Sequence, residues 1–322
     1  MTQALEVIAP GLYTTVQDLG RIGYQDVGLP TSGPLDRISL RLANALVGNS
    51  PGTPVFEMLL QGPTLKVLAE SVRVALVGCN ASIDIRSGTA RSIPAGQSVR
   101  LTRDEVFRIG NLGDSVCAYV AIEGGPDVPA VLGSASTFVR GAIGGFHGRR
   151  LQKGDSVPLK LAGVNVRGES TLPRPLDLAL DQPIRVVLGP QTDCFTDDAV
   201  QTFLSSEYTV TPQADRMGYR LDGPALTHTK GHDLVSDGIV TGSVQVPGSG
   251  RPIVLMVDNQ TTGGYPKIAT VISADMPIVA RRKPGRTIRF VAVDVNAAVL
   301  LRKEQEAVLQ RDCAAIIAPF PR

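Results

Sequence analysis

The chain has 322 residues, and 32 Lys and Arg against 30 Asp and Glu give a net charge of +2. This length is enough for two domains, and so small a charge favours neither nucleic acid nor an anionic membrane. The four cysteines lack the paired spacing of a zinc or redox site. Apolar runs are too short for a membrane span, and the N-terminus lacks the pattern of a signal peptide. We therefore expect a cytoplasmic protein with no metal site.

The first half of the chain is predicted to be mainly β. The whole chain has 34 glycines and 23 prolines, and in this half they punctuate short apolar stretches, which is typical of strands and turns. A strand is expected at residues 6–8, and a helix at 35–47 begins after Pro34 and stops at Gly48. Further strands are predicted at residues 55–60, 64–68, 72–77, 82–85, 98–101, 106–109, 117–122 and 156–161.

The second half repeats this character after a proline-rich linker. Residues 184–188 predict a strand and 196–204 a helix, followed by strands at 240–246 and 253–257. Asp294 is placed to cap a last helix that runs to about Arg311. Gly62-Pro63 and Gly223-Pro224 occupy similar places in the two halves. We predict a tandem duplication with domains at residues 1–165 and 184–322, a linker at 166–183, and one short helix near the start of each domain.

Residues 258–267 form a polar segment between two apolar strands. A hairpin needs only about two to five turn residues, whereas this segment supplies a carboxylate, amides, hydroxyls, a phenol and an ammonium around two glycines. Glycine lets another backbone or a ligand approach closely. The segment is either a polar loop that closes a β-barrel or part of a functional site. We favour a site because neighbouring segments are polar and glycine-rich in the same way.

Three other polar clusters are candidates for the same site. They are Gln17, Asp18, Arg21, Ser32 and Asp36; His147 and Arg149; and Asp215, Arg216, Tyr219 and Arg220. Each has a structural alternative, since Asp36 lies where a helix start favours a carboxylate, Asp215 and Arg216 could form a salt bridge, and Gln17-Asp18 could form a turn.

Motifs for nucleotides, nucleophiles and metals are missing from the sequence. There is no P-loop, no dinucleotide-binding fingerprint after a strand and no serine nucleophile elbow. His228 and His232 have a metal-ligand separation but lie in a glycine-containing loop, and we interpret them as exposed loop histidines. The chain by itself therefore has no recognisable ATP site.

Several strings of residues, in order, resemble the biotin-dependent carboxyltransferase A/B-domain family, which includes allophanate hydrolase subunit 2, KipA and the C subunit of 5-oxoprolinase. The resemblance extends from about Gly11 to Phe290 and is carried by TTVQDLGRIGYQDVGLPTSGPLD, GGFHGRRLQKGD, ADRMGYRL, SDGIVTGSVQVPGSGRPIVLM and DNQTTGGYPKIA. One departure is MPIVARRKPG, where the family resemblance leads us to expect a leucine and an Ala-Gln.

The resemblance implies two tandem cyclophilin-like β-barrel domains and a non-autonomous enzyme subunit. The implied activity is part of an ATP-dependent 5-oxoprolinase, which opens 5-oxoproline to glutamate. The implied partners are a separate C/D-domain protein, similar to the B subunit of 5-oxoprolinase or to KipI, and a third 5-oxoprolinase subunit. Two alternatives stay open: the carboxyltransferase half of a urea carboxylase that uses carboxybiotin, or a KipA-like antagonist of a kinase inhibitor without chemistry. The chain has no Met-Lys-Met biotinylation site.

The candidate site residues follow from these patterns and the resemblance together. We predict three catalytic residues, Asp258, Gln260 and Lys267. The predicted substrate-binding residues are Asn259, Thr261, Thr262, Gly263, Gly264, Tyr265, Arg216, Tyr219, Gln17, Asp18, Ser32, Asp36, His147 and Arg149. We expect the loop at 258–267 to line a cleft that faces the loops of the first domain, because polar loops converge on ligands at barrel mouths and domain interfaces.

Overall fold

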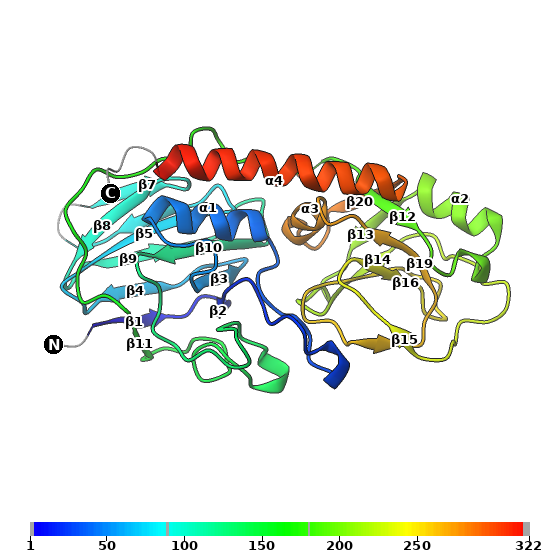
Figure 1. Ribbon diagram of the computed structural model, residues 1–322, viewed down its shortest axis with the longest axis horizontal. Coiled ribbons are helices and arrows are strands. Elements are labelled where there is room, and N and C mark those ends of the chain that lie inside the picture. The colour runs from blue at the N-terminus through cyan, green and yellow to red at the C-terminus, as the bar shows by residue number, and fades with distance from the viewer. Residues whose placement is uncertain (1–2, 88–89, 180, 318–322) are drawn as a thin grey trace. The chain divides into compact units, whose positions relative to one another are not determined.

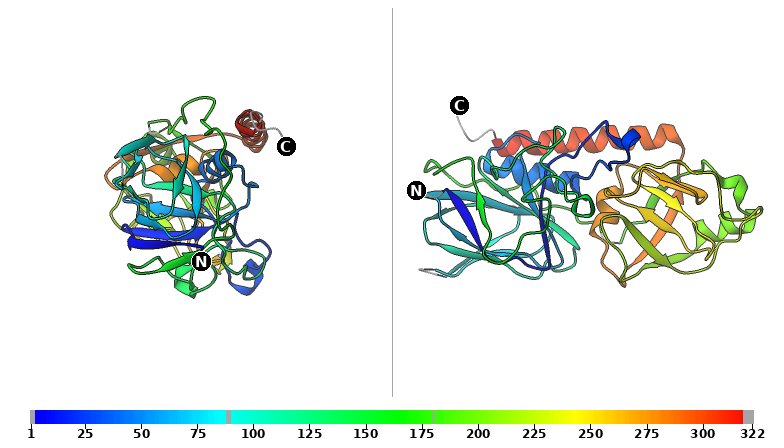
Figure 2. Two further views of the ribbon diagram at one scale, coloured as in Figure 1. Left: turned by 90° about the vertical axis from the view of Figure 1, so that its left-hand side faces the viewer. Right: turned by 90° about the horizontal axis from the view of Figure 1, so that it is seen from below.

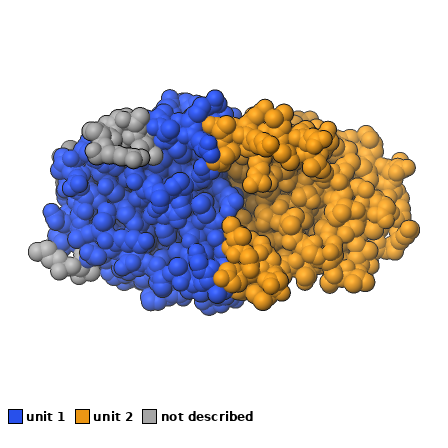
Figure 3. Space-filling model, viewed as in Figure 1, with its two compact units in different colours: residues 1–21, 32–178, 308–322 blue, residues 22–31, 179–307 orange. Residues whose placement is uncertain are grey.

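The computed structural model describes residues 3–87, 90–179 and 181–317, which form a mainly β protein with a few helices (Figure 1). The chain divides into two compact units, coloured separately in Figure 3. Unit 1 comprises residues 1–21, 32–178 and 308–322, and unit 2 comprises residues 22–31 and 179–307. Among the described helices, none combines the length and apolar character needed to cross a bilayer.

Unit 1 is built from two antiparallel sheets around one apolar core. The first sheet has the strand order β11 (Ser156–Pro158), β1 (Ala4–Ala9), β4 (Thr64–Val67), β9 (Val106–Ile109), β6 (Ser82–Ile85) and β7 (Arg91–Pro94). The second has the order β2 (Tyr13–Gln17), β3 (Val55–Leu59), β10 (Cys117–Ile122), β5 (Ser71–Val77) and β8 (Ser98–Thr102). Val, Leu, Ile and Phe side chains of both sheets are fully buried between them, and this burial is the main source of the unit's stability.

Helix α1 (Arg37–Val47) packs against β5 and β10 of unit 1. It begins where the Asp36 carboxylate accepts hydrogen bonds from the backbone N–H groups of Ile38 (3.0 Å) and Ser39 (3.1 Å). It ends at Gly48, whose φ of 81° lies in the left-handed region that glycine adopts at helix ends. Both boundaries therefore follow from local sequence.

Unit 2 is a closed barrel, visible in the yellow and orange strands of Figure 2. Around the barrel the order is β12 (Ile184–Leu188), β19 (Lys267–Val271), β16 (Ser243–Gln245), β17 (Ile253–Leu255), β14 (Gly218–Asp222), β13 (Glu207–Val210) and β20 (Thr287–Ala292). A separate two-stranded sheet joins β15 (Asp237–Gly238) to β18 (Thr262–Gly263). Closure leaves the barrel strands without open edges.

Other described helices occur in the second half of the chain, among or after the barrel strands. Helix α2 (Asp197–Ser205) is capped by Thr196, whose hydroxyl accepts from the Ala199 N–H at 3.1 Å, and it packs on β20. Its Phe203 ring stacks on Phe290 at 4.5 Å. The others are α3 (Met276–Arg281) and α4 (Val295–Ile317).

The mainly β prediction is confirmed, with instructive differences in detail. The expected barrel is closed in unit 2, whereas the described strands of unit 1 form two sheets. Strand β7 was not predicted because its sequence is polar and ends in proline. The Gly-Pro repeat is only partly matched: one strand, β3, separates α1 from Gly62, but two strands, β13 and β14, separate α2 from Gly223. The predicted domain limits stay a prediction.

Candidate functional site

The polar segment 258–267 connects β17 to β19 in unit 2 and is held in shape by a second loop. Its strand β18 pairs with β15, which sets Gly263 opposite Asp237. Gly263 has no space for a side chain, because a Cβ there would lie 2.4 Å from Cδ1 of Ile239 and 2.7 Å from Nε2 of Gln245. A Cβ at Gly264 would lie 2.9 Å from the Leu234 carbonyl oxygen. The two glycines thus allow other segments of the same polypeptide to approach closely, as the sequence suggested.

Lys267 is the centre of a polar cluster at this loop. Its side chain is 4% exposed, and Nζ donates to Oδ2 of Asp237 at 2.8 Å and to the Gly238 carbonyl at 3.2 Å. Its backbone N–H donates to Oε1 of Gln191 at 3.0 Å. The ammonium of Lys267 holds the pKa of Asp237 below its usual value. The cluster therefore joins a buried cation to a carboxylate that is 61% exposed to solvent.

Sequence reasoning did not include Asp237 and Gln191 in the site. Asp237 lies in the same glycine-rich stretch as the predicted residues, so its neighbourhood carried a signal. Gln191 is 76 residues from Lys267 along the chain, and nothing in the sequence connects the two.

Arg216 and Asp258 form a buried, bidentate ion pair. Nε and Nη2 of Arg216 donate to the two Asp258 carboxylate oxygens at 2.8 and 3.1 Å, and the side chains are 4% and 7% exposed. The Asp215 carboxylate instead accepts from the N–H groups of Met217 and Gly218. Arg216 thus forms a salt bridge with Asp258, a partner that the sequence did not suggest. Nearby, the Tyr219 hydroxyl donates to the Ala280 carbonyl at 3.0 Å.

Asn259 has a different environment from its neighbours. The residue is 6% exposed, yet within the described part of the chain no group forms a hydrogen bond with its side-chain amide. Gln260 and Thr262 are exposed, Thr261 is half-buried, and Tyr265 is 40% exposed. The Asn259 amide is therefore available to a ligand.

In unit 1, Asp18 and Gln17 hold the loop that contains residues 134–137. The Asp18 carboxylate accepts from the hydroxyls of Ser134 and Ser136, both at 2.6 Å, and from the N–H groups of Gly20 and Ala135. Nε2 of Gln17 donates to the Thr137 carbonyl at 3.1 Å, whereas its buried Oε1 has no partner among the described residues. Arg21 donates to carbonyls of the same loop.

Asp36 and Ser32 lie at the start of α1. Asp36 caps this helix and also accepts from the Ser39 hydroxyl, which is the structural alternative that its position suggested. Its own N–H donates to the Tyr119 hydroxyl, which in turn donates to Glu57, at 2.7 Å each. Burial and Glu57 raise the pKa of Tyr119 well above its usual value, so it stays a neutral donor. Ser32 has a φ of 53° and a buried hydroxyl without a described partner.

His147 and Arg149 lie in the glycine-rich loop before β11. His147 is exposed with a φ of 57°, and its ring contacts Phe146 edge-on at 4.2 Å between centroids. Nη1 and Nη2 of Arg149 donate to the Asp155 carboxylate at 2.7 and 2.8 Å. This pair lowers the pKa of Asp155 and raises that of Arg149. The expectation that these loops face the loop of unit 2 stays a prediction.

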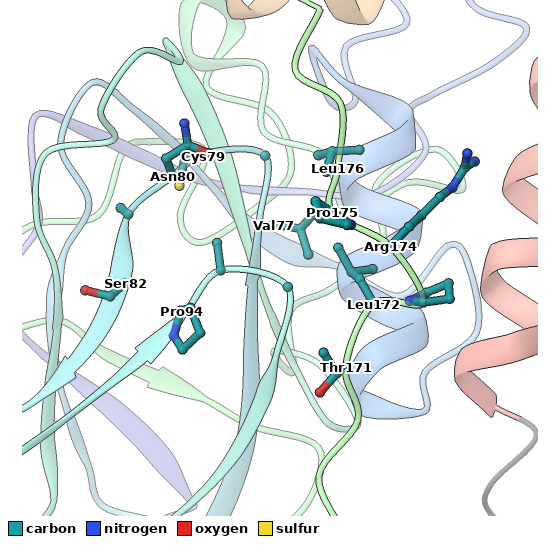
Figure 4. Close-up of a pocket in the computed structure, with 15 residues that line it drawn as sticks. Val77, Cys79, Asn80, Ser82, Pro94, Thr171, Leu172, Arg174, Pro175 and Leu176 are labelled. Carbon is teal, nitrogen blue, oxygen red and sulfur yellow. The ribbon is translucent and has the colours of Figure 1, made fainter.

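Unit 1 also contains a cavity of about 550 Å³ that none of the predicted site residues lines (Figure 4). Its walls include Val77, Leu172, Pro175 and Leu176, with the Cys79 thiol among them. Burial raises the pKa of Cys79 to about 11, so the thiol stays protonated and unreactive at neutral pH. Across the residues that the structure describes, no group of His, Cys, Asp and Glu side chains is arranged to hold a metal ion.

Fold and sequence together define the class of this protein. It belongs to the carboxyltransferase domain, subdomain A and B, family, whose model matches residues 27–292. This finding confirms the resemblance in the sequence.

Relatives of two kinds are similar to the chain. It is 37% identical over 311 residues to the 5-oxoprolinase C subunit of Escherichia coli (strain K12). This alignment covers 95% of this chain and 97% of that protein. It is 35% identical to the 5-oxoprolinase C subunit of Haemophilus influenzae (strain ATCC 51907 / DSM 11121 / KW20 / Rd), over 92% of this chain and 94% of that one. Its structure matches the crystal structure of the K. lactis urea amidolyase with a TM-score of 0.89 and 30% identity, over 96% of this chain and 20% of that chain.

Proposed function

We propose that this protein is a subunit of an ATP-dependent 5-oxoprolinase that opens 5-oxoproline to L-glutamate. The observation that carries the proposal is the 37% identity to the C subunit of 5-oxoprolinase over nearly the full length of both chains. By contrast, the chain corresponds to only 20% of the urea amidolyase. The sequence holds no nucleotide-binding motif, so we assign the use of ATP to the assembled enzyme and not to this chain alone.

The loop of unit 2 supplies groups that suit a lactam with a carboxylate. Lys267 is a buried cation, and its bonds to Asp237 and Gly238 leave an N–H for a ligand carboxylate. Asn259 has an amide whose donor and acceptor could pair with the N–H and C=O of the lactam ring. Donors that are fixed before the substrate arrives stabilise the charge that develops on a carbonyl oxygen during ring opening. In this proposal Lys267 orients the substrate and Asn259 polarises it.

Arg216 and Asp258 play a supporting part in the proposal. Their bidentate pair neutralises both charges, so Arg216 positions the start of the loop through Asp258. Gln260 and Tyr265 are exposed side chains of the same loop and are available to substrate or to a partner protein.

The complex is tested by reconstitution. This chain is combined with a C/D-domain protein and a third 5-oxoprolinase subunit, and glutamate release from 5-oxoproline is measured with ATP. We expect turnover only when all three proteins are present. Full activity of the two partners without this chain would contradict the proposal. We further propose that the complex with these two partner proteins forms in the cytoplasm.

A second function is favoured by the family and by the K. lactis structure. In a biotin-dependent carboxyltransferase the carboxyl group comes from carboxybiotin, whose ureido ring presents the same kind of N–H and C=O edge as a lactam. The amide of Asn259 would hold that ring. Urea-dependent ATP consumption with a biotin carboxylase and a biotin carrier, in place of 5-oxoproline turnover, would establish this alternative.

A further inference from the structure

A second cavity of unit 1, of about 430 Å³, is lined by both basic and apolar residues. It lies between the turn that joins β1 to β2 and the loop that follows His147. Its apolar lining includes Gly11, Leu12 and Val139, and its basic lining is Arg149, Arg150 and Lys153. A volume of this size is typical of small-molecule sites, which pair apolar walls with a few polar groups.

The basic loop of this cavity is held rigidly by Asp155. The Asp155 carboxylate accepts hydrogen bonds from Arg149 and from the Gln152 N–H, both at 2.7 Å. The backbone carbonyl of Asp155 accepts a hydrogen bond from the Val7 N–H at 2.8 Å. The Leu151 N–H donates to the Thr14 carbonyl at 2.9 Å, which ties the loop to β2. The loop is thus ordered before any ligand binds, and a preorganised site loses less entropy on binding.

The charges of the loop are only partly neutralised. Asp155 pairs with Arg149, whereas no described carboxylate forms an ion pair with Arg150 or Lys153. The Arg150 guanidinium lies over the Tyr13 ring at 5.1 Å from its centroid, and a contact of this kind orients a cation without neutralising it. With Asp155 counted against Arg149, two positive charges are left at the cavity.

We propose that this cavity binds a small molecule with a dianionic oxyanion head group, a phosphate ester or a dicarboxylate. Arg150 and Lys153 bind the head group, and the apolar lining residues contact the attached carbon atoms. Guanidinium and ammonium donors form their strongest hydrogen bonds with such oxyanions. This site is formed by residues of unit 1 alone, and its proposal does not rest on the proposed 5-oxoprolinase reaction.

Calorimetric titration of the purified full chain tests the site. Inorganic phosphate and succinate are used as probes, with chloride at matched ionic strength as the reference for unspecific screening. We expect saturable binding of at least one probe, and the tighter probe identifies the head group as phosphate or carboxylate. Arg150→Ala/Lys153→Ala should weaken this binding about tenfold or more, because charge-assisted hydrogen bonds are lost.

A matched pair of substitutions provides the control. Arg86→Ala/Lys160→Ala removes the same charges from exposed positions of unit 1 that lie outside the cavity, and it should leave the affinity within about twofold, the limit set by screening. Circular dichroism checks that both variants are folded. The proposal is overturned if neither probe binds more than chloride does, or if both double variants lose affinity equally.

Discussion

At the scale of single residues, substitution of Asn259 tests whether this side chain binds a ligand or stabilises the fold. Its amide forms no hydrogen bond among the described residues, so Asn259→Ala should leave the melting temperature nearly unchanged. In the reconstituted complex we expect kcat/KM to fall about ten- to a hundredfold, as the loss of one ligand hydrogen bond implies. Asn296→Ala, at an exposed amide of α4, is the control and should change neither. A destabilised Asn259→Ala variant with intact turnover would instead give Asn259 a scaffolding role.

The ion pair of Lys267 and Asp237 predicts a pH dependence of stability. Lys267 lowers the folded-state pKa of Asp237, so the pair stabilises the fold above the unfolded pKa of about 3.9. This stabilisation is lost as the pH falls through the lower, folded-state pKa. Urea unfolding midpoints of the wild type and Asp237→Asn should therefore differ at neutral pH and converge in acid. Asp26→Asn removes an exposed carboxylate outside any described ion pair and should run parallel to the wild type; a similar convergence for it would refute the assignment.

At the scale of elements, helix α1 depends on the residue that caps its start, Asp36. Asp36→Ala removes the cap of two backbone N–H groups and the partner of the buried Ser39 hydroxyl, and we expect it to lower the free energy of unfolding by about 1–2 kcal/mol. Asp36→Asn can still cap and should recover part of this loss. Chemical denaturation measures both. If Asp36→Ala keeps its stability while the reconstituted complex loses turnover, Asp36 belongs with the substrate-binding residues.

At the scale of the whole molecule, we expect the purified chain alone to release no glutamate from 5-oxoproline with ATP. The physical reason is that the chain lacks a nucleotide-binding motif. Glutamate release is assayed with the lone chain and again after the partner proteins are added. ATP-dependent turnover by the lone chain would show that it carries a complete active site.

The sequence by itself determined the features that rest on neighbouring residues. Gly48 ends α1 as predicted, whereas the helix begins at Arg37, two residues after the predicted start, with Asp36 as its cap. Asp294 accepts from the Ala297 N–H at 2.8 Å at the start of the last helix, as predicted. Caps and turns are local hydrogen bonds, so their residue types identify them. Long apolar runs also gave the buried strands, such as β5 and β10, because only such runs fill a core.

Only the tertiary structure decided which polar residues meet. Arg216 pairs with Asp258 across 42 residues, and Lys267 pairs with Asp237 across 30. Strand register and barrel closure bring these groups together, and side-chain period alone does not fix which strands are neighbours. The same reason explains why Asp18 and Arg21 proved to hold the loop at residues 131–137: their partners lie over 100 residues away and become neighbours only when the sheet forms.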